Sequence, residues 1–412
     1  MNVWLINHYS LPPSEAGGTR HYDLAKELEK LGFNVTIFAS AFNHNNKDFI
    51  YDLKEKSWIL KNEEGVRFIW VKTHPYQKNN YRRLINILGF TIRSIFIGRK
   101  ISKLIKEINK PDVIIGCSVH IFAVVSGYIL SKIHNSGFFV EMRDLWPQTL
   151  IDMGVWRRWY PQVPVIRMIE RFLFYKADRI ITLSPKTKKY LDNINEKLLE
   201  KEVYIPNGTK VSRFDVNKKA TLEIGTPKIR SMFLGSIGYK NGVDWIIDAM
   251  EIIEDDHPDL LECFLIGGGP EKVKLVKKVA QMGLSNVTFI EPIPRERVPY
   301  YALQADFFIL TEREVYYGSS NKLFDYMAAG KPIVTSVFAE HNDIVEEIEC
   351  GYSTKPGNIQ ELANKITKMA LLSEEERAQM GKRALDYALE YHDYSVLANK
   401  LAEAIDNTYT ER

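Results

Sequence analysis

The sequence predicts an α/β fold made of two doubly wound domains, each built on a parallel sheet. Three observations predict this fold. Short apolar runs of strand length recur along the chain, stretches with helical periodicity separate them, and the whole pattern restarts after Asn207-Gly208. Neighbouring parallel strands need a crossover connection, which is usually a helix, so this alternation is typical of parallel sheets. The length of 412 residues also favours more than one domain.

The chain opens with a strand–loop–helix–strand unit. Val3–Tyr9 is an apolar run of strand length, and the loop that follows contains Gly17 and Gly18. Arg20–Leu31 carries leucines at helical spacing, and Val35–Ala39 is the next predicted strand. Adjacent glycines allow backbone to come close to a bound group, so Gly17 and Gly18 are candidate ligand-binding residues. The spaced glycines of a dinucleotide fingerprint are missing, which disfavours a nicotinamide-dependent enzyme.

The apolar runs divide between two domains, residues 1–205 and 206–392. A C-terminal helix, about residues 393–412, is predicted to pack back on the first domain. Further strands of the first domain are predicted at Val66–Val71, Val113–Gly116, Phe138–Val140, Ile180–Leu183 and Val203–Ile205. In the second domain, strands are predicted at Met232–Leu234, Cys263–Ile266, Val287–Ile290, Phe307–Leu310 and Ile333–Thr335, with helices that include Val243–Glu251 and Glu271–Met282. Beyond them, helices are predicted at Glu374–Glu390 and Ser395–Ile405.

The composition is that of a globular protein, with 45% hydrophobic and 26% charged residues. Cys117, Cys263 and Cys350 lie far apart, which argues against a disulfide framework and a zinc site and fits a reducing compartment. The first residues lack the basic start and the length of a signal peptide, and no apolar run approaches the roughly 20 residues needed to span a bilayer. We therefore expect a cytoplasmic protein.

The charge is divided unevenly between the two halves of the chain. Residues 1–200 carry 30 Lys and Arg against 19 Asp and Glu, whereas residues 201–412 carry 25 against 33. A basic half joined to an acidic half suggests that the first half faces an anionic partner.

Two segments of the basic half have the composition of membrane-binding surfaces. The stretch 82–106 combines seven basic residues and no acidic residue with interleaved apolar side chains, and Trp156–Tyr160 combines aromatic residues with arginine. These segments predict a peripheral protein on the anionic inner face of the cell membrane. The alternative is a helix that packs its apolar face on its own sheet and leaves its charges solvated.

The most informative stretch is Tyr317–Pro332, which lies between two predicted strands. A small polar loop leads into a short helix that Gly330 and Pro332 end. The free backbone N–H groups at such a helix start suit an anion such as a diphosphate. Lys322 lies in the first turn, where the helix dipole disfavours a cation, so a bound phosphate would explain it. Asp325, one turn later, can accept hydrogen bonds from a sugar diol. The alternative is a solvated helix start without a ligand.

Four segments occur in the order and spacing of a known enzyme group: Leu265–Glu271, Asn286–Phe289, Ala305–Phe307 and Lys322–Pro332. With them the chain resembles, over nearly its whole length, the large retaining glycosyltransferase group (family four-like) that includes sucrose, trehalose-phosphate and lipopolysaccharide transferases. The resemblance implies a GT-B fold, with two Rossmann-like domains and the active site in the cleft between them.

Two segments, Glu141–Pro147 and Asn321–Tyr326, are similar more narrowly to bacterial transferases of O-antigen and capsule assembly, including N-acetyl-L-fucosamine transferases. This similarity implies that a hexose or an amino sugar passes, with retention, from a nucleotide sugar (UDP is expected) to a polyprenyl-diphosphate-linked glycan acceptor. No nucleic-acid partner and no cofactor are implied. There is also no clustered Asp, Glu and His set, and Lys with backbone N–H groups can stabilise a leaving diphosphate, so no metal is expected.

The resemblance assigns the ribose-binding carboxylate, with a departure from the family pattern. Asp325 takes the place of the carboxylate, usually Glu, that binds the donor ribose. The usual partner Glu, eight residues earlier, is replaced by Tyr317, with Glu314 nearby.

A second departure concerns the diphosphate. In the loop after the first strand of the second domain, Ser236 and Asn241 replace the usual Arg and Lys, and Lys240 is shifted by one position. More of the diphosphate charge is therefore expected on Lys322 and its helix N-terminus. Further candidate donors are the Ser319–Lys322 backbone N–H groups, Arg143 and Arg297.

Arg143 and Asp144 follow the predicted strand Phe138–Val140, and ligands of open α/β sheets bind beyond the carboxyl ends of strands. Other family members have a His in this region that contacts the transferred sugar, and Asp144 or its neighbour would take its place. The alternative is an Asp that caps the next helix. His120 follows the strand Val113–Gly116 and is a candidate for the same site, although a lone His is more often structural.

The remaining candidates come from short motifs. Asn207-Gly208 resembles the family's Asn-Gly near the donor, although an ordinary turn would look the same. Ile293 lies where members hold the nucleobase. The candidate catalytic residues are thus Asp144, Arg143 and Lys322; the acceptor-binding candidates are Gly17, Gly18 and His120; and the donor-binding candidates are Asn207, Gly235, Lys240, Gly268, Ile293, Arg297, Ser319, Ser320, Asn321, Leu323 and Asp325.

Two other functions remain open at this point. A GT-B sugar-nucleotide epimerase needs the donor site but neither an acceptor nor a membrane. A non-catalytic adaptor for another transferase or for the membrane would tolerate Tyr317 and Ser236 at positions where the family has charged residues.

Overall fold

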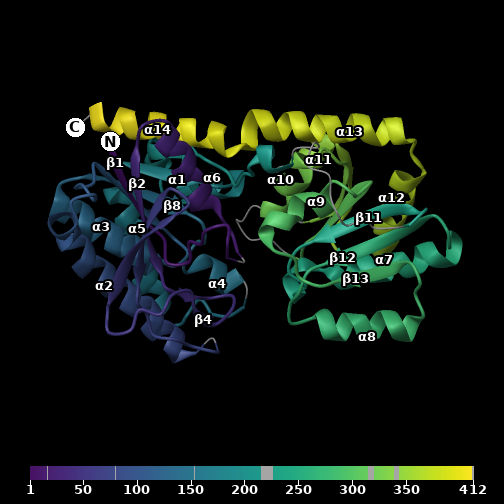
Figure 1. Ribbon diagram of the computed structural model, residues 1–412, viewed down its shortest axis with the longest axis horizontal. Helices are drawn as coiled ribbons and strands as arrows, with labels where there is room; N and C mark the ends of the chain where they lie inside the picture. Colours follow the sequence, from purple (N-terminus) through teal and green to yellow (C-terminus); the bar gives the residue numbers. More distant parts are fainter. Residues whose placement is uncertain are drawn as a thin grey trace. The chain divides into compact units, whose positions relative to one another are not determined.

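The computed structural model describes residues 1–15, 17–78, 80–152, 154–214, 226–313, 320–337 and 343–410. These residues divide into two compact units, whose elements are labelled in Figure 1. Unit 1 contains Met1–Pro206 and the C-terminal helix that begins at Tyr394, and unit 2 contains the described residues from Asn207 to Asp393. Each unit is a Rossmann-like α/β structure, as the sequence predicts.

Unit 1 is built on a sheet that has eight strands within the described residues. The strands are β1 (Asn2–Ile6), β2 (Asn34–Ser40), β5 (Trp58–Glu63), β6 (Val66–Val71), β7 (Val113–Cys117), β8 (Gly137–Met142), β9 (Arg179–Thr182) and β10 (Glu202–Tyr204), and a separate antiparallel pair is formed by β3 (Phe42–Asn43) and β4 (Asp48–Phe49). Their order is β10-β9-β8-β7-β1-β2-β6-β5. β5 pairs antiparallel with β6, and the other neighbours in this sheet are parallel.

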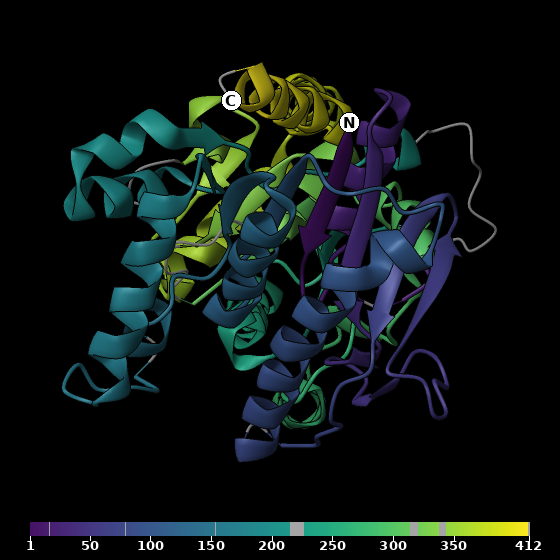
Figure 2. The same cartoon turned by 90° about the vertical axis from the view of Figure 1, so that its left-hand side faces the viewer.

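Helices cover both faces of this sheet. They are α1 (Arg20–Lys30), α2 (Tyr81–Leu104), α3 (Ile121–His134), α4 (Gln148–Asp152), α5 (Gln162–Lys176), α6 (Pro185–Ile194), α14 (Tyr394–Thr410) and the 3-10 helix η1 (Glu196–Lys201). Side chains alternate between the faces of a strand, so Val3 and Leu5 of β1 pack with α1 and α14, whereas Trp4 and Ile6 pack with α2 and α3. α5 packs on β8 on the same face as α2 and α3 (Figure 2).

Unit 2 is built on a second sheet, which has six strands within the described residues. The strands are β11 (Ile229–Leu234), β12 (Leu261–Ile266), β13 (Val287–Ile290), β14 (Phe307–Thr311), β15 (Ile333–Ser336) and β16 (Gly351–Ser353). They run parallel in the order β13-β12-β11-β14-β15-β16.

The helices of unit 2 also form two layers. They are α7 (Val243–Asp256), α8 (Lys272–Met282), α9 (Val298–Ala302), α10 (Asn321–Ala328), α11 (Ile344–Glu347), α12 (Ile359–Leu371) and α13 (Glu374–Tyr387), with 3-10 helices η2 (Val211–Phe214), η3 (Tyr239–Asn241) and η4 (Arg295–Arg297) and a π-helical turn η5 (Ala388–His392). Phe233 of β11 packs with α7, α8 and α12, whereas its neighbour Met232 packs with α9, α10 and α13.

Every strand predicted from the sequence is present, but some ends differ. β1 ends at Ile6 rather than Tyr9, because the Asn7 side chain accepts a hydrogen bond from the Tyr9 backbone N–H at 2.9 Å and turns the chain. The predicted helix Glu374–Glu390 ends as an α-helix at Tyr387 and continues as the π-helical turn. The sequence analysis missed β5 and β16, and also the two-residue strands β3 and β4. β5 is a partly exposed edge strand with mixed apolar and charged residues, and β16 has only three residues.

The strand order reverses once in each sheet. In unit 1 the chain runs from β1 to β2 on one side and returns to β7 on the other, and in unit 2 β12 and β14 flank β11 in the same way. Loops that leave the two strands at such a switch point run to opposite sides and leave a crevice at the carboxyl ends, where open α/β sheets bind ligands. The ends of β1 and β7, and of β11 and β14, are therefore the expected ligand sites.

Candidate functional site

Lys322 forms the centre of the site at the carboxyl ends of β11 and β14. Its Nζ donates to Oε1 of Glu312 at 2.7 Å and to Oδ1 of Asn241 at 2.8 Å. The Ser320 hydroxyl donates to the same Glu312 oxygen at 2.8 Å. Glu312 directly follows β14 and is buried. Its carboxylate therefore accepts both hydrogen bonds in a place where solvent screens their electrostatic attraction only weakly. We call Asn241, Glu312, Ser320 and Lys322 the Lys322 cluster.

The loop after β11 lies directly against Lys322. A Cβ atom on Gly235 would lie 2.7 Å from Lys322 Cε, so glycine leaves room for this side chain. A Cβ atom on Gly267, in the loop after β12, would lie 1.9 Å from the Gly235 carbonyl oxygen. The two glycines thus let two loops and the lysine pack together. Gly268, a predicted donor-binding residue, lies in the same loop beside Pro292.

Asn241 closes the loop after β11. Its Nδ2 donates to the Ser236 carbonyl oxygen at 2.7 Å, while its Oδ1 accepts from Lys322. The neighbouring Lys240 has an exposed side chain, and its carbonyl oxygen accepts from the Arg313 backbone N–H at 2.7 Å. Asn241, which the sequence resemblance places at a usual Lys position, thus contacts Lys322 through its amide oxygen and brings no charge of its own.

Helix α10 starts beside this loop with Ser320 as its N-cap residue. The Ser320 side chain makes no capping hydrogen bond to the helix, and its hydroxyl donates to Glu312. A helix start without its own side-chain cap suits an anion, which accepts hydrogen bonds from the first backbone N–H groups. Ser319, Tyr317 and Glu314 lie outside the described residues.

Asp325 lies one turn into α10, and other side chains bond both of its oxygens. Oδ1 accepts from Thr209 Oγ1 at 2.8 Å, and Oδ2 lies 3.1 Å from Arg295 Nη1. Arg297, the arginine selected from the sequence, is exposed. Since Arg295 and Arg297 belong to the same Pro-Arg-Glu-Arg segment, no sequence signal separates them.

The other donor candidates lie around this helix. Asn207 is buried, and its carbonyl oxygen accepts from His392 Nδ1 at 2.9 Å. Ile293 and Leu323 are partly buried against the core cluster that contains α10. Glu312, Arg295 and Thr209 were missed. A signal existed for Glu312, which lies two residues after the predicted buried strand Phe307–Leu310 and thus near a carboxyl end of the predicted sheet.

His8 and His120 meet at the ends of β1 and β7, the switch point of unit 1. His8 Nδ1 lies 2.6 Å from His120 Nε2, and both rings are buried. His120 is also the N-cap residue of α3, where its Nδ1 accepts from the Ala123 backbone N–H at 3.1 Å. Burial, and then the nearby Arg83, lower the pKa of His120 to about 3, so the ring is neutral near pH 7. Both ring nitrogens of this acceptor-binding candidate thus bond within the protein.

Arg143 and Asp144 follow β8 and are held against the end of β7. The Ser118 hydroxyl accepts from the Arg143 backbone N–H at 3.0 Å and donates to the Asp144 carbonyl oxygen at 3.0 Å. The Asp144 side chain is exposed, whereas Arg143 is half-buried. Arg143 Nη1 is buried, with no hydrogen-bond partner among the described residues.

Gly17 and Gly18 lie in the loop before α1. A Cβ atom on Gly17 would lie 2.6 Å from Leu11 Cδ1, so a larger residue here would require the end of the Leu11 side chain to move. Gly18 is exposed. These glycines, together with His120, Arg143 and Asp144, belong to unit 1, while the donor candidates from Asn207 onward that the structure describes belong to unit 2.

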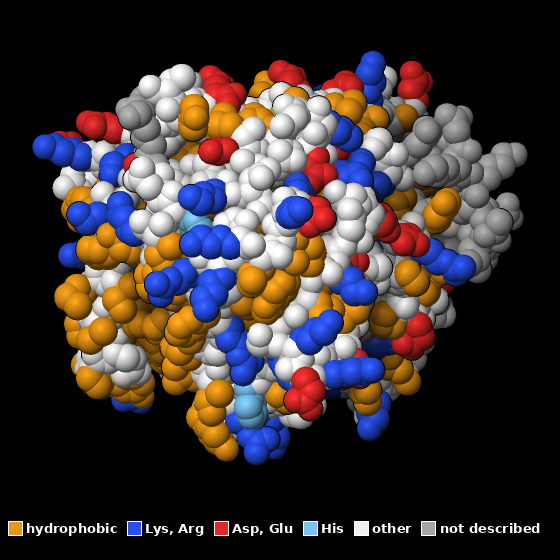
Figure 3. Space-filling view, turned by 60° about the vertical axis from the view of Figure 1, so that its left-hand side comes forward, with side chains coloured by type: hydrophobic (Ala, Val, Ile, Leu, Met, Phe, Trp, Pro, Cys, Tyr) orange, Lys and Arg blue, Asp and Glu red, His pale blue; other side chains and the backbone are white. Residues whose placement is uncertain are grey.

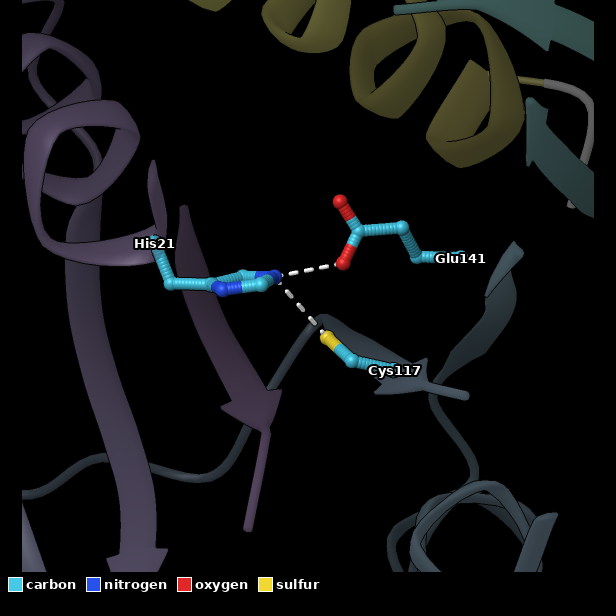
Figure 4. A group of neighbouring side chains, drawn as sticks. All are labelled: His21, Cys117 and Glu141. Carbon is cyan, nitrogen blue, oxygen red and sulfur yellow. Dashed lines mark hydrogen bonds and ion pairs between the residues drawn. The ribbon is translucent and has the colours of Figure 1, made fainter. Parts of the chain in front are cut away.

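A buried polar group joins α1, β7 and β8 beneath this loop. Figure 4 shows one nitrogen of the His21 ring pointing toward both the Glu141 carboxylate and the Cys117 sulfur, and the sulfur lies 3.2 Å from His21 Nε2. Arg20 Nε donates to the other Glu141 oxygen at 2.7 Å, and its guanidinium also bonds the carbonyl oxygens of Ile205 and Pro206.

His21, Cys117 and Glu141 are metal-ligand residue types, and their ligand atoms lie within 4.8 Å of one another. The sequence analysis found no clustered ligands, because these residues come from distant segments. Their chemistry fits a hydrogen-bonded anchor better than a metal site. Burial, and then the adjacent Glu141, raise the pKa of the Cys117 thiol, so in the absence of a metal the thiol keeps its proton. The Glu141 carboxylate is already paired with the permanently charged guanidinium of Arg20.

Comparisons with known proteins agree with this architecture. The family model described as Glycosyltransferase Family 4 matches residues 17–213, and the model described as Glycosyl transferases group 1 matches residues 215–386. WcaI of Escherichia coli, named as a glycosyl transferase of colanic acid biosynthesis, is 23% identical over 270 residues, which are 62% of this chain and 64% of WcaI. The matched part of the chain thus spans just under two-thirds of that relative.

Two solved structures show the same fold. Sucrose-phosphate synthase from Thermosynechococcus elongatus superposes with a TM-score of 0.75 at 18% identity and covers 100% of both chains. HepE from Anabaena in complex with UDP-glucose superposes with a TM-score of 0.68 at 16% identity, over 99% of this chain and 100% of HepE. The two family models, matched one after the other over nearly the whole chain, and the two Rossmann-like units lead to one conclusion: the chain belongs to the GT-B glycosyltransferases, with a family 4 domain followed by a group 1 domain.

Proposed function

We propose that this protein transfers a hexose or an amino sugar, with retention, from a UDP-sugar to a polyprenyl-diphosphate-linked acceptor during the assembly of a surface polysaccharide. The Lys322 cluster at the β11–β14 switch point carries the proposal, because it combines a cation with an uncapped helix start. The name of the relative WcaI supports polysaccharide assembly, and the UDP-glucose in HepE supports the nucleotide.

The donor diphosphate would bind at the start of α10. Two negative charges develop as the nucleotide leaves, and the enzyme has to stabilise them. Neither Ser236 nor Asn241 brings a charge, so Lys322 and the first backbone N–H groups of α10 would carry most of this task. Asp325 would accept hydrogen bonds from the ribose, with Arg295 holding its carboxylate.

The acceptor would bind unit 1 at the ends of β1, β7 and β8. Gly17, Gly18, Arg143 and Asp144 lie in loops at these ends, and the buried His120 lies in the loop after β7. The half-buried Arg143 is the natural partner for an acceptor phosphate or for the leaving diphosphate, because one of its donors has no partner among the described residues.

The protein would work at the inner membrane surface. Helix α2 buries Ile87, Phe90, Ile97 and Ile101 on its own sheet but leaves a second apolar row exposed beside its arginines: Leu84, Ile85, Leu88, Ile92 and Phe96. A helix with solvated charges alone would not need this second row, so the row supports peripheral membrane contact. Among the described residues, no helix combines the length and the apolarity that crossing a bilayer demands.

The experiment measures sugar transfer and UDP binding for wild type, Lys322→Ala and Asp325→Ala. Removing one donor to a developing charge typically costs about 100- to 1,000-fold in rate, so Lys322→Ala should lose at least that much kcat. Asp325→Ala should mainly weaken UDP binding. Lys277→Ala, an exposed lysine on α8, is the control. Unchanged turnover and binding in both variants would refute the assignment, and release of an epimerised sugar without acceptor would favour an epimerase. Activity that survives EDTA is expected, since no step needs a metal.

A further inference from the structure

Helix α5 has two apolar faces. Val163, Ile166, Leu173 and Phe174 are buried against the sheet, as in any amphipathic helix. A second row of large apolar side chains points away from the core and stays exposed: Val165, Met168, Phe172 and Tyr175. Spacings of three and four residues place this row along one side of the helix. Within unit 1, Tyr128 of α3 packs edge-to-face on Phe172 and Asn195 donates to the Tyr175 hydroxyl, but the four side chains of the row remain 45–65% exposed.

A groove runs beside this exposed row. It has a volume of about 540 Å³ and is lined by Arg158, Trp159, Val163, Pro164, Arg167, Met168 and Arg171. Trp159 is 72% exposed, although exposed tryptophan is costly in water. Figure 3, which turns this side of the molecule forward, shows apolar and basic side chains intermingled over the region of α2 and α5.

The positive charge of the groove is not neutralised within the described protein. No ion pair joins Arg158, Arg167 or Arg171 to a described carboxylate, and Arg167 donates only to the neutral Gln148 at 3.1 Å. Glu170 is the one acidic residue in the α5 sequence, and it is buried beneath the helix, where it accepts from the Tyr190 hydroxyl at 2.7 Å. Burial raises the pKa of Glu170 to about 8 against the opposing effects of the Tyr190 hydrogen bond and the nearby Arg167 and Arg171, so this carboxyl is mostly uncharged near pH 7.

We propose that this groove binds the phosphate of an anionic membrane phospholipid, with Trp159 and the exposed row of α5 resting in the interfacial region of the bilayer. Three features support this occupant. Guanidinium groups bond phosphate oxygens in pairs. Tryptophan favours the headgroup level, and an exposed apolar row beside basic residues is typical of helices that lie in the membrane surface. A soluble phosphate compound would need the arginines but not the apolar row.

The groove rests on the proposed membrane-side location and not on the transfer reaction. α5 packs on the same face of the sheet as α2, so both exposed rows belong to one side of unit 1. The basic helix α2 would attract any anionic membrane surface. The α5 groove would in addition bind an individual phospholipid headgroup.

The test is co-sedimentation of the full chain with phosphatidylcholine vesicles that contain or lack phosphatidylglycerol. The variant Arg158→Gln/Arg171→Gln removes two exposed charges. Each basic residue near an anionic surface contributes about 1 kcal/mol, so binding to the anionic vesicles should weaken by about 30-fold. The control variant Lys277→Gln/Lys382→Gln removes two exposed charges from unit 2 and should bind like wild type.

A second variant, Trp159→Ser/Met168→Ser, keeps the charges and should also weaken vesicle binding. Equal binding of wild type and the arginine variant would overturn the proposal. So would binding of inorganic phosphate, detected by an Arg158- and Arg171-dependent thermal shift, without any vesicle binding. UDP-induced thermal stabilisation of the same variants reports separately on the donor site. If the wild type binds vesicles but is not stabilised by UDP, the result would contradict the proposed function and still support the headgroup site.

Discussion

The ammonium of Lys322 lies 2.7 Å from the carboxylate of Glu312, which directly follows β14 and is buried. This pair explains why a lysine is tolerated in the first turn of α10, where the helix dipole disfavours a cation. A phosphate is therefore not needed to explain the position of Lys322. The hydrogen bond from Lys322 to Glu312 fixes the position of the ammonium group. A donor diphosphate would therefore bind to an ammonium that is already oriented.

Glu312→Ala should lower kcat by about 100-fold with a smaller change in KM for the nucleotide sugar, because a misplaced catalytic group costs rate more than binding. Glu312→Gln should recover much of the activity, since its amide oxygen can still accept from Lys322 and Ser320. Steady-state kinetics with varied donor check both. Tighter nucleotide binding in Glu312→Ala at unchanged kcat would mean that Glu312 competes with the diphosphate instead of positioning the lysine.

Arg295→Gln and Asp325→Asn should each weaken UDP binding, and the double variant should lose little more than either single one. The two residues are in contact at 3.1 Å, and contacting residues typically couple by about 0.5–3 kcal/mol. Calorimetric titration of the four proteins with UDP gives the coupling energy. Arg297→Gln is the informative comparison. A larger loss of UDP affinity in Arg297→Gln than in Arg295→Gln would show that Arg297, the residue selected from the sequence, binds the donor instead.

Glu141→Gln should destabilise the protein by about 3–5 kcal/mol near pH 7, because Arg20 would stay buried without its carboxylate. Urea unfolding followed by tryptophan fluorescence measures this loss. Glu29→Gln, at a looser pair with Arg67 whose atoms lie 3.9 Å apart, is the control and should cost less than about 1 kcal/mol.

The Arg20–Glu141 pair also predicts that the stability of the protein depends on pH. Burial alone would raise the pKa of Glu141, but His21 and Arg20 hold it well below its usual value. The stabilisation is therefore complete above the unfolded-state pKa of about 4.3 and is lost as the pH falls through the lower folded-state pKa. The difference between wild type and Glu141→Gln should shrink below about pH 4. A difference that stays constant into that range would contradict the assignment.

Glu170→Gln should gain stability relative to wild type as the pH rises. Burial raises the pKa of Glu170 to about 8, so the folded state binds a proton that the unfolded state releases near pH 4. Wild-type stability should thus decline between about pH 5 and pH 8 relative to the glutamine variant, which keeps the acceptor for the Tyr190 hydroxyl. Urea unfolding at pH 6 and pH 9 checks this, and parallel curves would show that Glu170 ionises normally.

The donor side of the site was predictable in part. The strand β14, the helix α10 and the position of Lys322 follow from an apolar run, a polar loop and Gly330, which are local signals. Glu312 and Arg295 are different, because their importance comes from contacts with residues 10 and 30 positions away. No local pattern carries such contacts, and Arg297 looked equally suitable in the sequence.

The alternation of strands and helices, the two Rossmann-like units and the family could all be predicted from the sequence, because they depend on periodicity and on contiguous motifs. Which side chains meet depends on the folded arrangement of each unit. It paired Lys322 with Glu312 and Asp325 with Arg295, buried His120 against His8, and gathered His21, Cys117 and Glu141 from three distant segments. It also left the second apolar row of α5 exposed. Each of these outcomes depends on how strands are ordered in a sheet and on which helix face the core covers, and both are set by packing across the whole unit.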